Sequence, residues 1–254
     1  MNSSPPIVFC HYGNVDYLAK ALLCASLTNP STRKILLGDS SNKYTALACG
    51  WEHFSMENIN SMLRSSFNEN FKYIRGPLHG ITKNGGDWLR FVFERWYYVQ
   101  EFCISNNIAK FWHFDSDVMI VEDLRIFTPA LMSNYDYTTQ CNDSCLNGFI
   151  DSSMLTDFCQ FIIDLFKNTD FIQAQQLEFD TVNPNFAFTE MRAFLEFRDS
   201  AVNTYRGIHL ESIFEGWCFD DCICQEDDFS MIYHSYTNRH IKNIFFEYSS
   251  IKKL

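Results

Sequence analysis

Two aspartates, one residue apart, stand between two apolar runs. Asp115 and Asp117 lie in the segment FWHFDSDVMIVEDL, residues 111–124. Alternation along a strand would place both carboxylates on one side, with Ser116 opposite. Two carboxylates directed at one point repel each other unless a cation lies between them. The alternative is a strand end whose aspartates cap a helix or face solvent. We favour a divalent metal ion bound to a diphosphate, because Mg²⁺ and Mn²⁺ prefer oxygen ligands and keep positions open for phosphates.

The preceding elements predict a parallel sheet that ends at these aspartates. In chain order we expect a strand at 5–13, a helix at 15–29, a strand at 33–40, a helix at 88–107 and a strand at 109–117. Asp87 caps the long helix and Asn106-Asn107 closes it, and its apolar character predicts burial. Ligands of open α/β sheets bind at the carboxyl ends of the strands, which is where the two aspartates are expected.

The second half of the chain is less regular. Helical patterns cover residues 152–168 and 188–200, and the acidic segment 213–229 resembles a solvated loop. A late strand and turn follow from residue 230. There is no internal repeat and no clear linker, so we expect one domain over residues 1–254.

Composition narrows the classes of function. The chain has 254 residues, is 46% hydrophobic and carries a formal net charge of -11. Such a charge argues against nucleic-acid binding, which needs a basic face. We find neither a secretory leader nor a stretch of transmembrane length, and therefore expect a soluble, cytoplasmic protein.

The ten cysteines are scattered and favour free thiols. Five of them form two closer groups that offer a zinc alternative: Cys141, Cys145, Cys218, Cys222 and Cys224. None of these pairs has the common C-x-x-C spacing, so zinc is the weaker interpretation.

Together these motifs resemble the GT-A-fold nucleotide-sugar glycosyltransferases. The resemblance rests on Ile7-Val8-Phe9 with His11-Tyr12-Gly13-Asn14, Leu36-Leu37-Gly38-Asp39, Phe93-Glu94-Arg95-Trp96 and His113-Phe114-Asp115-Ser116-Asp117. It covers residues 5 to about 125 well and is looser beyond. It implies an α/β fold with a mostly parallel, Rossmann-like central sheet flanked by helices and an irregular C-terminal acceptor-side region. Residues 1 to about 125 would bind the nucleotide sugar, and about 126–254 the acceptor.

The resemblance also implies roles for particular residues. Asp115 and Asp117 would hold Mn²⁺ or Mg²⁺ against the donor diphosphate, with Asp117 as the direct ligand. The candidates for contacts with the nucleoside are His11, Gly13, Asn14, Tyr17 and Asp39, and either Tyr12 or Tyr17 would stack on a base. Arg95 or Arg90 would pair with the diphosphate or with Asp115.

A histidine near the C-terminus is a further metal candidate by resemblance. Relatives carry a pattern like H-x-x-G-x-x-K, and the segment HSYTNRHIK offers His234 at its first position. Thr237 replaces the glycine and His240 stands at the lysine position, with Lys242 just beyond. These departures leave the third ligand open.

The acceptor side offers two candidate general bases. Glu190 and Asp151 each lie among apolar residues, and an inverting enzyme needs a base near the acceptor hydroxyl. The segment NGFIDSSM, residues 147–154, resembles the part that lines the sugar pocket. The sequence does not decide between inversion and retention.

We therefore expect a metal-dependent glycosyltransferase acting on a nucleotide-sugar donor and a glycan, lipid-linked or protein acceptor. One alternative is a degenerate domain that binds a sugar nucleotide or glycan without turnover. A more distant alternative is a haloacid-dehalogenase-like phosphatase, which expects Thr or Val where Met119 stands.

Overall fold

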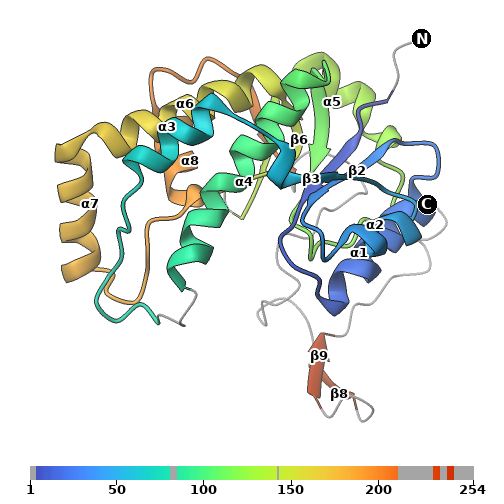
Figure 1. Cartoon of the computed structure of the whole chain (residues 1–254), viewed down its shortest axis with the longest axis horizontal. Helices are drawn as coiled ribbons and strands as arrows, with labels where there is room; N and C mark the ends of the chain where they lie inside the picture. Colours follow the sequence, from blue (N-terminus) through green and yellow to red (C-terminus); the bar gives the residue numbers. More distant parts are fainter. Residues whose placement is uncertain (1–3, 81–84, 142, 211–230, 235–238, 243–254) are drawn as a thin grey trace.

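The computed structural model describes residues 4–80, 88–141 and 143–210, together with the backbone of 85–87, 231–234 and 239–242. Its centre is a seven-stranded, mostly parallel mixed sheet flanked by helices (Figure 1). The strands are β1 Ile7–Cys10, β2 Lys34–Gly38, β3 Glu52–Ser55, β4 Lys110–His113, β5 Tyr137–Gln140, β6 Cys145–Asp151 and β7 Gly207–His209. The expected fold class is confirmed.

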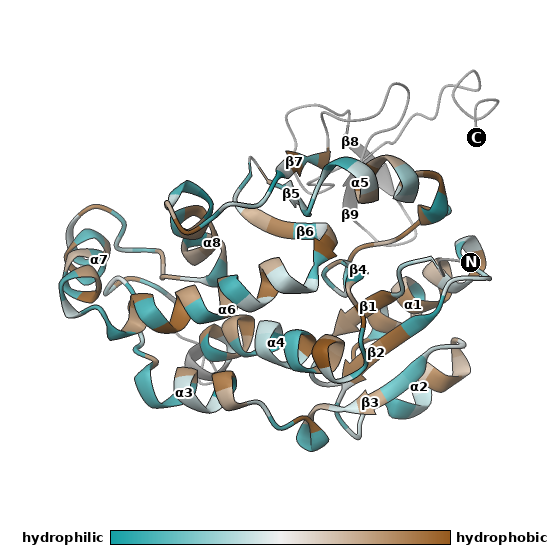
Figure 2. Cartoon of the chain, turned by 90° about the horizontal axis from the view of Figure 1, so that it is seen from above, coloured by the Kyte–Doolittle hydropathy of each residue, from teal (hydrophilic) through white to brown (hydrophobic). Residues whose placement is uncertain are grey.

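Helices cover both faces of this sheet (Figure 2). The helices are α1 Asp16–Thr28, α2 Lys43–Ala48, α3 Met62–Asn70, α4 Gly85–Ser105, α5 Thr128–Asn134, α6 Ser152–Lys167, α7 Thr169–Thr181 and α8 Glu190–Asp199. There are also two short 3₁₀ helices in the described residues, η1 Met56–Asn58 before α3 and η2 Leu124–Ile126 before α5. One apolar cluster joins the sheet to α3, α4, α6 and α8, and a second joins it to α1 and α5.

The strand order is β3-β2-β1-β4-β6-β5-β7. From β1 the chain proceeds outward through β2 and β3 and then returns to place β4 on the other side of β1, again in parallel. The order of the strands therefore reverses between β1 and β4. In open α/β sheets such a switch point leaves a crevice at the carboxyl ends of the strands. The crevice forms because the loops that follow the two neighbouring strands, here β1 and β4, leave in opposite directions.

Beyond β4 the sheet changes direction. β6 pairs antiparallel with β4, from Lys110 opposite Asp151 to His113 opposite Gly148. β5 pairs antiparallel with β6, and β7 returns parallel to β5. The segment 147–154 is thus the end of a central strand and the start of α6, not a loop. The carboxyl end of β4 faces the beginning of β6.

The long apolar helix is confirmed, with a correction at its start. α4 begins at Gly85, so Asp87 lies inside the helix. Its end agrees with expectation, because Asn107 adopts the left-handed conformation, φ 53°, that commonly follows a helix. Trp96 and Tyr97 are buried against the sheet and α6.

The strand before the aspartates is shorter than expected. β4 ends at His113, and residues 115–118 form a turn closed by the Val118 N–H and the Asp115 carbonyl at 2.9 Å. The expectation that alternation along a strand aligns the two carboxylates is therefore wrong. A turn, not a pleated strand, presents them.

Two further expectations can be compared with the described residues. The seven cysteines among them form no disulfide, whereas Cys218, Cys222 and Cys224 lie outside the described part of the chain. Within the described residues, no helix has both the length and the hydrophobicity needed to cross a membrane.

Candidate functional site

The expected site residues gather at the carboxyl ends of β1, β2 and β4. The loop after β1 contains His11 and Gly13, and the turn after β2 contains Asp39. The turn after β4 contains Asp115 and Asp117. Because β1 lies between β2 and β4, its loop is the common neighbour of the other two.

Asp39 fixes the course of the loop after β1. Its carboxylate accepts a hydrogen bond of 2.6 Å from the Gly13 N–H and further bonds from Ser41. Gly13 has φ 86°, which only glycine adopts readily, and the space around its Cα is open for a ligand. Burial opposes ionisation of Asp39, but these hydrogen bonds outweigh it and hold the pKa of the carboxyl below its usual value. Asp39 thus stays charged and keeps the loop open.

Asn42 holds the same loop from behind, and sequence reasoning missed it. Its buried amide donates to the carbonyls of His11 and Gly13 at 3.0 and 2.9 Å, and its Oδ1 accepts from the His53 Nε2 at 3.0 Å. A Cβ on Gly38 would lie 2.1 Å from that Oδ1. The glycine in the Leu36-Leu37-Gly38-Asp39 motif therefore makes room for the Asn42 side chain.

His11 joins the loop after β1 to the acidic turn. Its Nδ1 shares a hydrogen bond of 2.7 Å with Ser116 Oγ, and its ring lies edge-on to Tyr17. Burial lowers the pKa of His11, and the negative charges of Asp39 and Asp117 oppose this in part. Its Nε2 is buried and has no protein partner among the described residues. A neutral imidazole thus ties Ser116 across the switch point.

The two aspartates of the turn have different surroundings. Asp117 is exposed, and its charge acts on His11 and Tyr17. Asp115 is half-buried and accepts a hydrogen bond of 2.5 Å from the Arg95 guanidinium on α4. Burial opposes ionisation of Asp115, but Arg95 and His113 hold its pKa below the usual value. The expected contact between Arg95 and Asp115 is therefore present, and the Asp117 side chain is open to solvent.

Arg95 also binds a second carboxylate. Its other terminal nitrogen donates to Glu190 at 2.9 Å, and the two side chains are only 13% and 10% exposed. Burial raises the pKa of Glu190, and Asp115 adds to this effect while Arg95 opposes it. Glu190, one of the two residues predicted as a base, is thus linked to Asp115 through the Arg95 guanidinium, which donates to both carboxylates.

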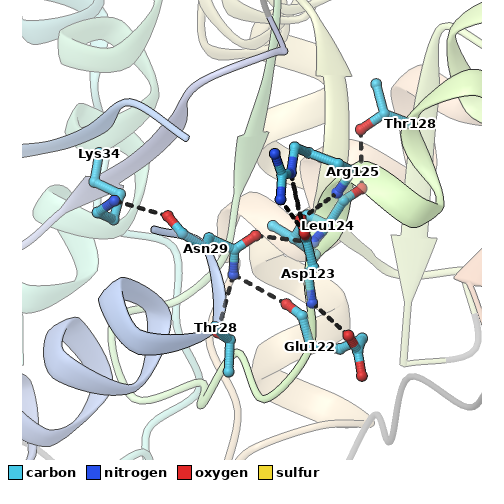
Figure 3. A network of polar contacts seen from close by, with 8 residues as sticks. All are labelled: Thr28, Asn29, Lys34, Glu122, Asp123, Leu124, Arg125 and Thr128. Carbon is cyan, nitrogen blue, oxygen red and sulfur yellow. Dashed lines mark hydrogen bonds and ion pairs between the residues drawn. The ribbon is translucent and has the colours of Figure 1, made fainter. Parts of the chain in front are cut away.

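The segment after the acidic turn is fastened to the end of α1 (Figure 3). The buried Asn29 side chain donates to the Glu122 carbonyl at 3.0 Å and accepts from the Leu124 N–H at 2.8 Å. Thr28 Oγ1 donates to the Ile120 carbonyl at 2.8 Å. The chain leaving Asp117 therefore runs back along α1, and the turn is anchored at both its ends.

Asp151 and Arg90 do not join this group, whereas Asn14 stays beside Gly13 in the loop after β1. Asp151 lies at the opposite end of the strands, beside the start of β4. There its carboxylate caps α6 by accepting from the Ser153 N–H, and it lies 3.7 Å from the Lys110 amine. Arg90 bonds Asn68 and Glu94 instead of the acidic turn. Asn14 accepts a hydrogen bond from Thr45 at the rim.

The expected C-terminal ligand can be placed only by its backbone. His234 is the last residue of β8 Met231–His234, which pairs antiparallel with β9 Arg239–Lys242. His240 and Lys242 lie on β9, and the side chains of all three, as well as Thr237, lie outside the described part of the structure.

The beginning of β6 adds neighbours that sequence reasoning missed. Gly148 opposes His113 with φ 91°, and the adjacent Asn147 is buried with its amide bonded to Gln140 at 2.7 Å. The Cys145 thiol lies close enough to Arg95 to interact electrostatically. Cys141 and burial raise the pKa of Cys145, so it remains a thiol. No sequence signal identified this strand as facing β4.

The donor set of the turn suits a hard divalent cation. Mg²⁺ is typically bound by one or two carboxylates and completed by substrate phosphates and water. Asp117 is exposed and Asp115 is ionised, which supplies two such oxygen ligands. Among the described residues there is no group of three or more acidic, histidine or cysteine side chains that would hold a metal ion alone. Asp115 and Asp117 thus offer carboxylate oxygens but, among the described residues, not a complete set of metal ligands.

Comparisons with known proteins give distant structural neighbours. No protein-family model and no curated protein sequence matches the chain. The glycosyltransferase GlyE of Streptococcus pneumoniae TIGR4 is similar with a TM-score of 0.43 and 13% identity, over 83% of this chain and 46% of that one. The PaToxG glycosyltransferase is similar with a TM-score of 0.39 and 9% identity, over 79% and 73% of the two chains. This chain spans less than half the length of GlyE, and at such TM-scores neither likeness carries an argument about activity.

Proposed function

We propose that the chain is a metal-dependent glycosyltransferase of the GT-A type that takes its sugar from a nucleotide donor. The observation that carries the proposal is the position of the acidic turn. Asp115 and Asp117 follow β4 at the switch point of the sheet, where His11 and Ser116 link the turn to the loop after β1.

The loops after β1 and β2 would hold the nucleoside. The open space at Gly13 admits a close approach to the backbone, and Asn14 and Asp39 offer hydrogen-bonding groups beside it. Tyr17 lies beside the Asp117 turn and is half-exposed, so it is the candidate for stacking on the base. A nucleoside here would direct its diphosphate toward the acidic turn.

Asp115 and Asp117 would hold Mn²⁺ or Mg²⁺, which neutralises the charge on a leaving diphosphate. His234 stays a proposal for a third ligand. Arg95 orients Asp115 through their hydrogen bond and keeps it ionised. The protein thus prepares the carboxylates before the donor arrives, and their fixed positions lower the reorganisation needed in the transition state.

We take Glu190 as the general base, because it lies beside Asp115 through their shared contact with Arg95. In an inverting displacement, the acceptor hydroxyl oxygen bonds to the anomeric carbon as the bond to the diphosphate oxygen breaks. The diphosphate leaves with the electron pair, and the hydroxyl proton passes to the base. A raised pKa suits a carboxylate for this task. We favour Glu190 over Asp151, because Asp151 caps α6 at the end of β6 that lies beside the start of β4.

The two halves of the single domain then have separate tasks. Residues before about 125 would bind the donor, whereas β6 and α8 would face the acceptor. A glycan, a lipid-linked sugar or a protein hydroxyl would serve as acceptor.

The test is a thermal-shift screen of UDP-, GDP-, CMP- and dTDP-sugars with and without Mn²⁺. A ligand at 100 times its Kd stabilises the native state by about 2.7 kcal/mol, which raises the melting temperature. We expect a shift that requires the metal and disappears in Asp117→Ala, but persists in the control Glu69→Ala on the exposed surface of α3. A metal-dependent shift that survives Asp117→Ala would overturn the proposed site. Donor binding without release of nucleoside diphosphate would indicate a binding domain without turnover.

A further inference from the structure

Tyr12, in the loop after β1, and Tyr17, in the first turn of α1, point to different places. Tyr17 lies beside His11 and the acidic turn. Tyr12 instead packs on Phe91 of α4, with ring centroids 6.1 Å apart, and remains 70% exposed. Tyr17 thus lies beside the acidic turn, whereas Tyr12 lies against α4.

Tyr12 meets an aromatic face of α4. Trp88, Phe91 and Arg95 are three and four residues apart, so they lie along one face of the helix. Trp88 is 56% exposed and lies two turns, about 10 Å, before Arg95. Tyr12, Phe91 and Trp88 thus form an aromatic ledge that ends at the Arg95 guanidinium.

The charges at the foot of the ledge favour a neutral occupant. Arg95 already faces two carboxylates, Asp115 and Glu190, so this group is negative overall. A second phosphate would be repelled there, whereas hydroxyl groups can donate to the carboxylates. An aromatic surface beside such acceptors matches a pyranose ring, which has an apolar C–H face and a rim of hydroxyls.

We propose that the aromatic ledge of Tyr12, Phe91 and Trp88 is the acceptor subsite and stacks against a pyranose ring. The acceptor is then a glycan or glycoside, and not a protein side chain. This inference rests on the proposed function, because it assigns the acceptor of that same reaction. Stacking on the ledge directs the hydroxyl rim of the sugar toward Glu190.

Trp88 is also a spectroscopic reporter of this ledge. Trp51, Trp96 and Trp112 are buried, so a ligand on the ledge changes chiefly the Trp88 emission among the described tryptophans. The experiment is a fluorescence titration of the full chain with methyl β-D-glucopyranoside, methyl β-D-galactopyranoside and methyl α-D-mannopyranoside. Each glycoside is titrated into the protein without nucleotide, and again in the presence of UDP or GDP plus Mn²⁺. We expect a saturable blue shift with at least one glycoside, and its absence in Trp88→Phe identifies the reporter.

Two variants separate stacking from a general effect. Tyr12→Ala keeps the reporter and removes one ring of the ledge, so it should weaken glycoside binding about tenfold. Tyr44→Ala removes a ring that is 81% exposed on α2, and binding should stay unchanged. Saturation-transfer NMR should still detect the glycoside with Trp88→Phe, because the phenyl ring preserves stacking.

Three results would overturn the ledge as the acceptor subsite. In the first, none of the glycosides shifts the emission under any condition. In the second, Tyr12→Ala binds the glycoside with wild-type affinity. In the third, only nucleoside diphosphates shift the Trp88 emission. If these occur while the metal-dependent donor shift persists, the ledge alone is wrong. If glycosides bind the ledge but no donor binds with metal, the proposed transferase is wrong and the ledge is a sugar-binding surface.

Discussion

The Arg95 guanidinium connects Glu190, at the start of α8, to Asp115, in the turn after β4. One cation thereby joins two carboxylates that would otherwise repel each other in a poorly solvated place. Arg95 and Glu190 are largely buried, and the pKa of Arg95 is raised above its usual value by the two carboxylates, against the effect of burial. The link joins the turn after β4 to the start of α8.

Replacing Arg95 should therefore destabilise the fold. Arg95→Met leaves two carboxylates without their cation, and breaking such a pair costs about 3 kcal/mol. Urea unfolding measures the loss. Adding Glu190→Gln should recover part of it, because one of the uncompensated charges is removed. The control is Arg90→Met on the same helix, whose partly exposed pair with Glu94 contributes about 0.5 kcal/mol. Equal midpoints for Arg95→Met and Arg90→Met would contradict the stabilising link.

Asn42 supports the loop that we assign to the nucleoside. Asn42→Ala removes the donors to the His11 and Gly13 carbonyls, and leaving such groups unsatisfied costs about 2 kcal/mol. We also expect weaker donor binding, because the loop loses its fixed course. Both effects can be read from urea midpoints and from the donor-induced thermal shift. Asn60→Ala, an exposed residue before α3, serves as the control. An unchanged donor shift in Asn42→Ala would show that the loop is held by other contacts.

His113 should make stability depend on pH. Burial and Arg95 lower its pKa from 6.5 to about 4, and its Nδ1–H donates to the Val8 carbonyl at 2.8 Å. Between these two values the unfolded chain binds the proton and the folded chain does not. Stability therefore rises with pH across this window and is lost as the pH falls from 6.5 toward 4.

The contribution of His113 amounts to about 3 kcal/mol at pH 7 relative to pH 4. His113→Asn retains a side-chain donor for Val8 but has no proton to gain. Urea unfolding at several pH values between 7 and 4 measures the free energy of unfolding. Its decrease from pH 7 to pH 4 should be smaller for the variant by this amount. Parallel pH profiles for the two proteins would rule out His113 as the source.

Asn29 should matter for both the fold and the acidic turn, although it lies at the far end of α1. Asn29→Ala frees the Glu122 carbonyl and the Leu124 N–H, at a cost of about 2 kcal/mol. The segment leaving Asp117 then loses its anchor, so the metal-dependent donor shift should shrink. Arg125→Ala is the matched control from the same segment, because its ion pair with Asp123 lies on the surface. Full donor binding in Asn29→Ala would show that the turn needs no anchor there.

Local patterns in the sequence predicted the first half of the fold well. β1, α1 and β2 follow from short apolar runs and helical spacing, and the α4 signal is long and continuous. The end of β4 could not be predicted in this way, because Phe114 is apolar and continues the pattern of a strand. Only the hydrogen bond from Val118 to Asp115 reveals that a turn has begun.

Contacts between distant residues were harder to predict. Glu190 and Arg95 are 95 positions apart, and no periodicity connects them. In the sequence, Asp151 seemed equivalent to Glu190. Because β6 is antiparallel to β4, however, Asp151 lies beside the start of β4, at the opposite end of the strands from the acidic turn. Asn42 was overlooked because a single asparagine between a strand and a helix is ordinary turn chemistry. Its importance depends on the space left by Gly38.

The antiparallel placement of β6 has a consequence for how such a protein can diversify. Because β6 begins where β4 ends, Cys145, the residue that follows the tip of the β5–β6 hairpin, lies close to Arg95 and Asp115. Residues can be inserted or exchanged in that tip while the strand pairing on either side stays intact. A new tip would change the surface beside Arg95 and leave the loops after β1 and β2 untouched. Grafting tips of different length at this one position is therefore a route to vary, on an unchanged scaffold, the acceptor preference that we propose.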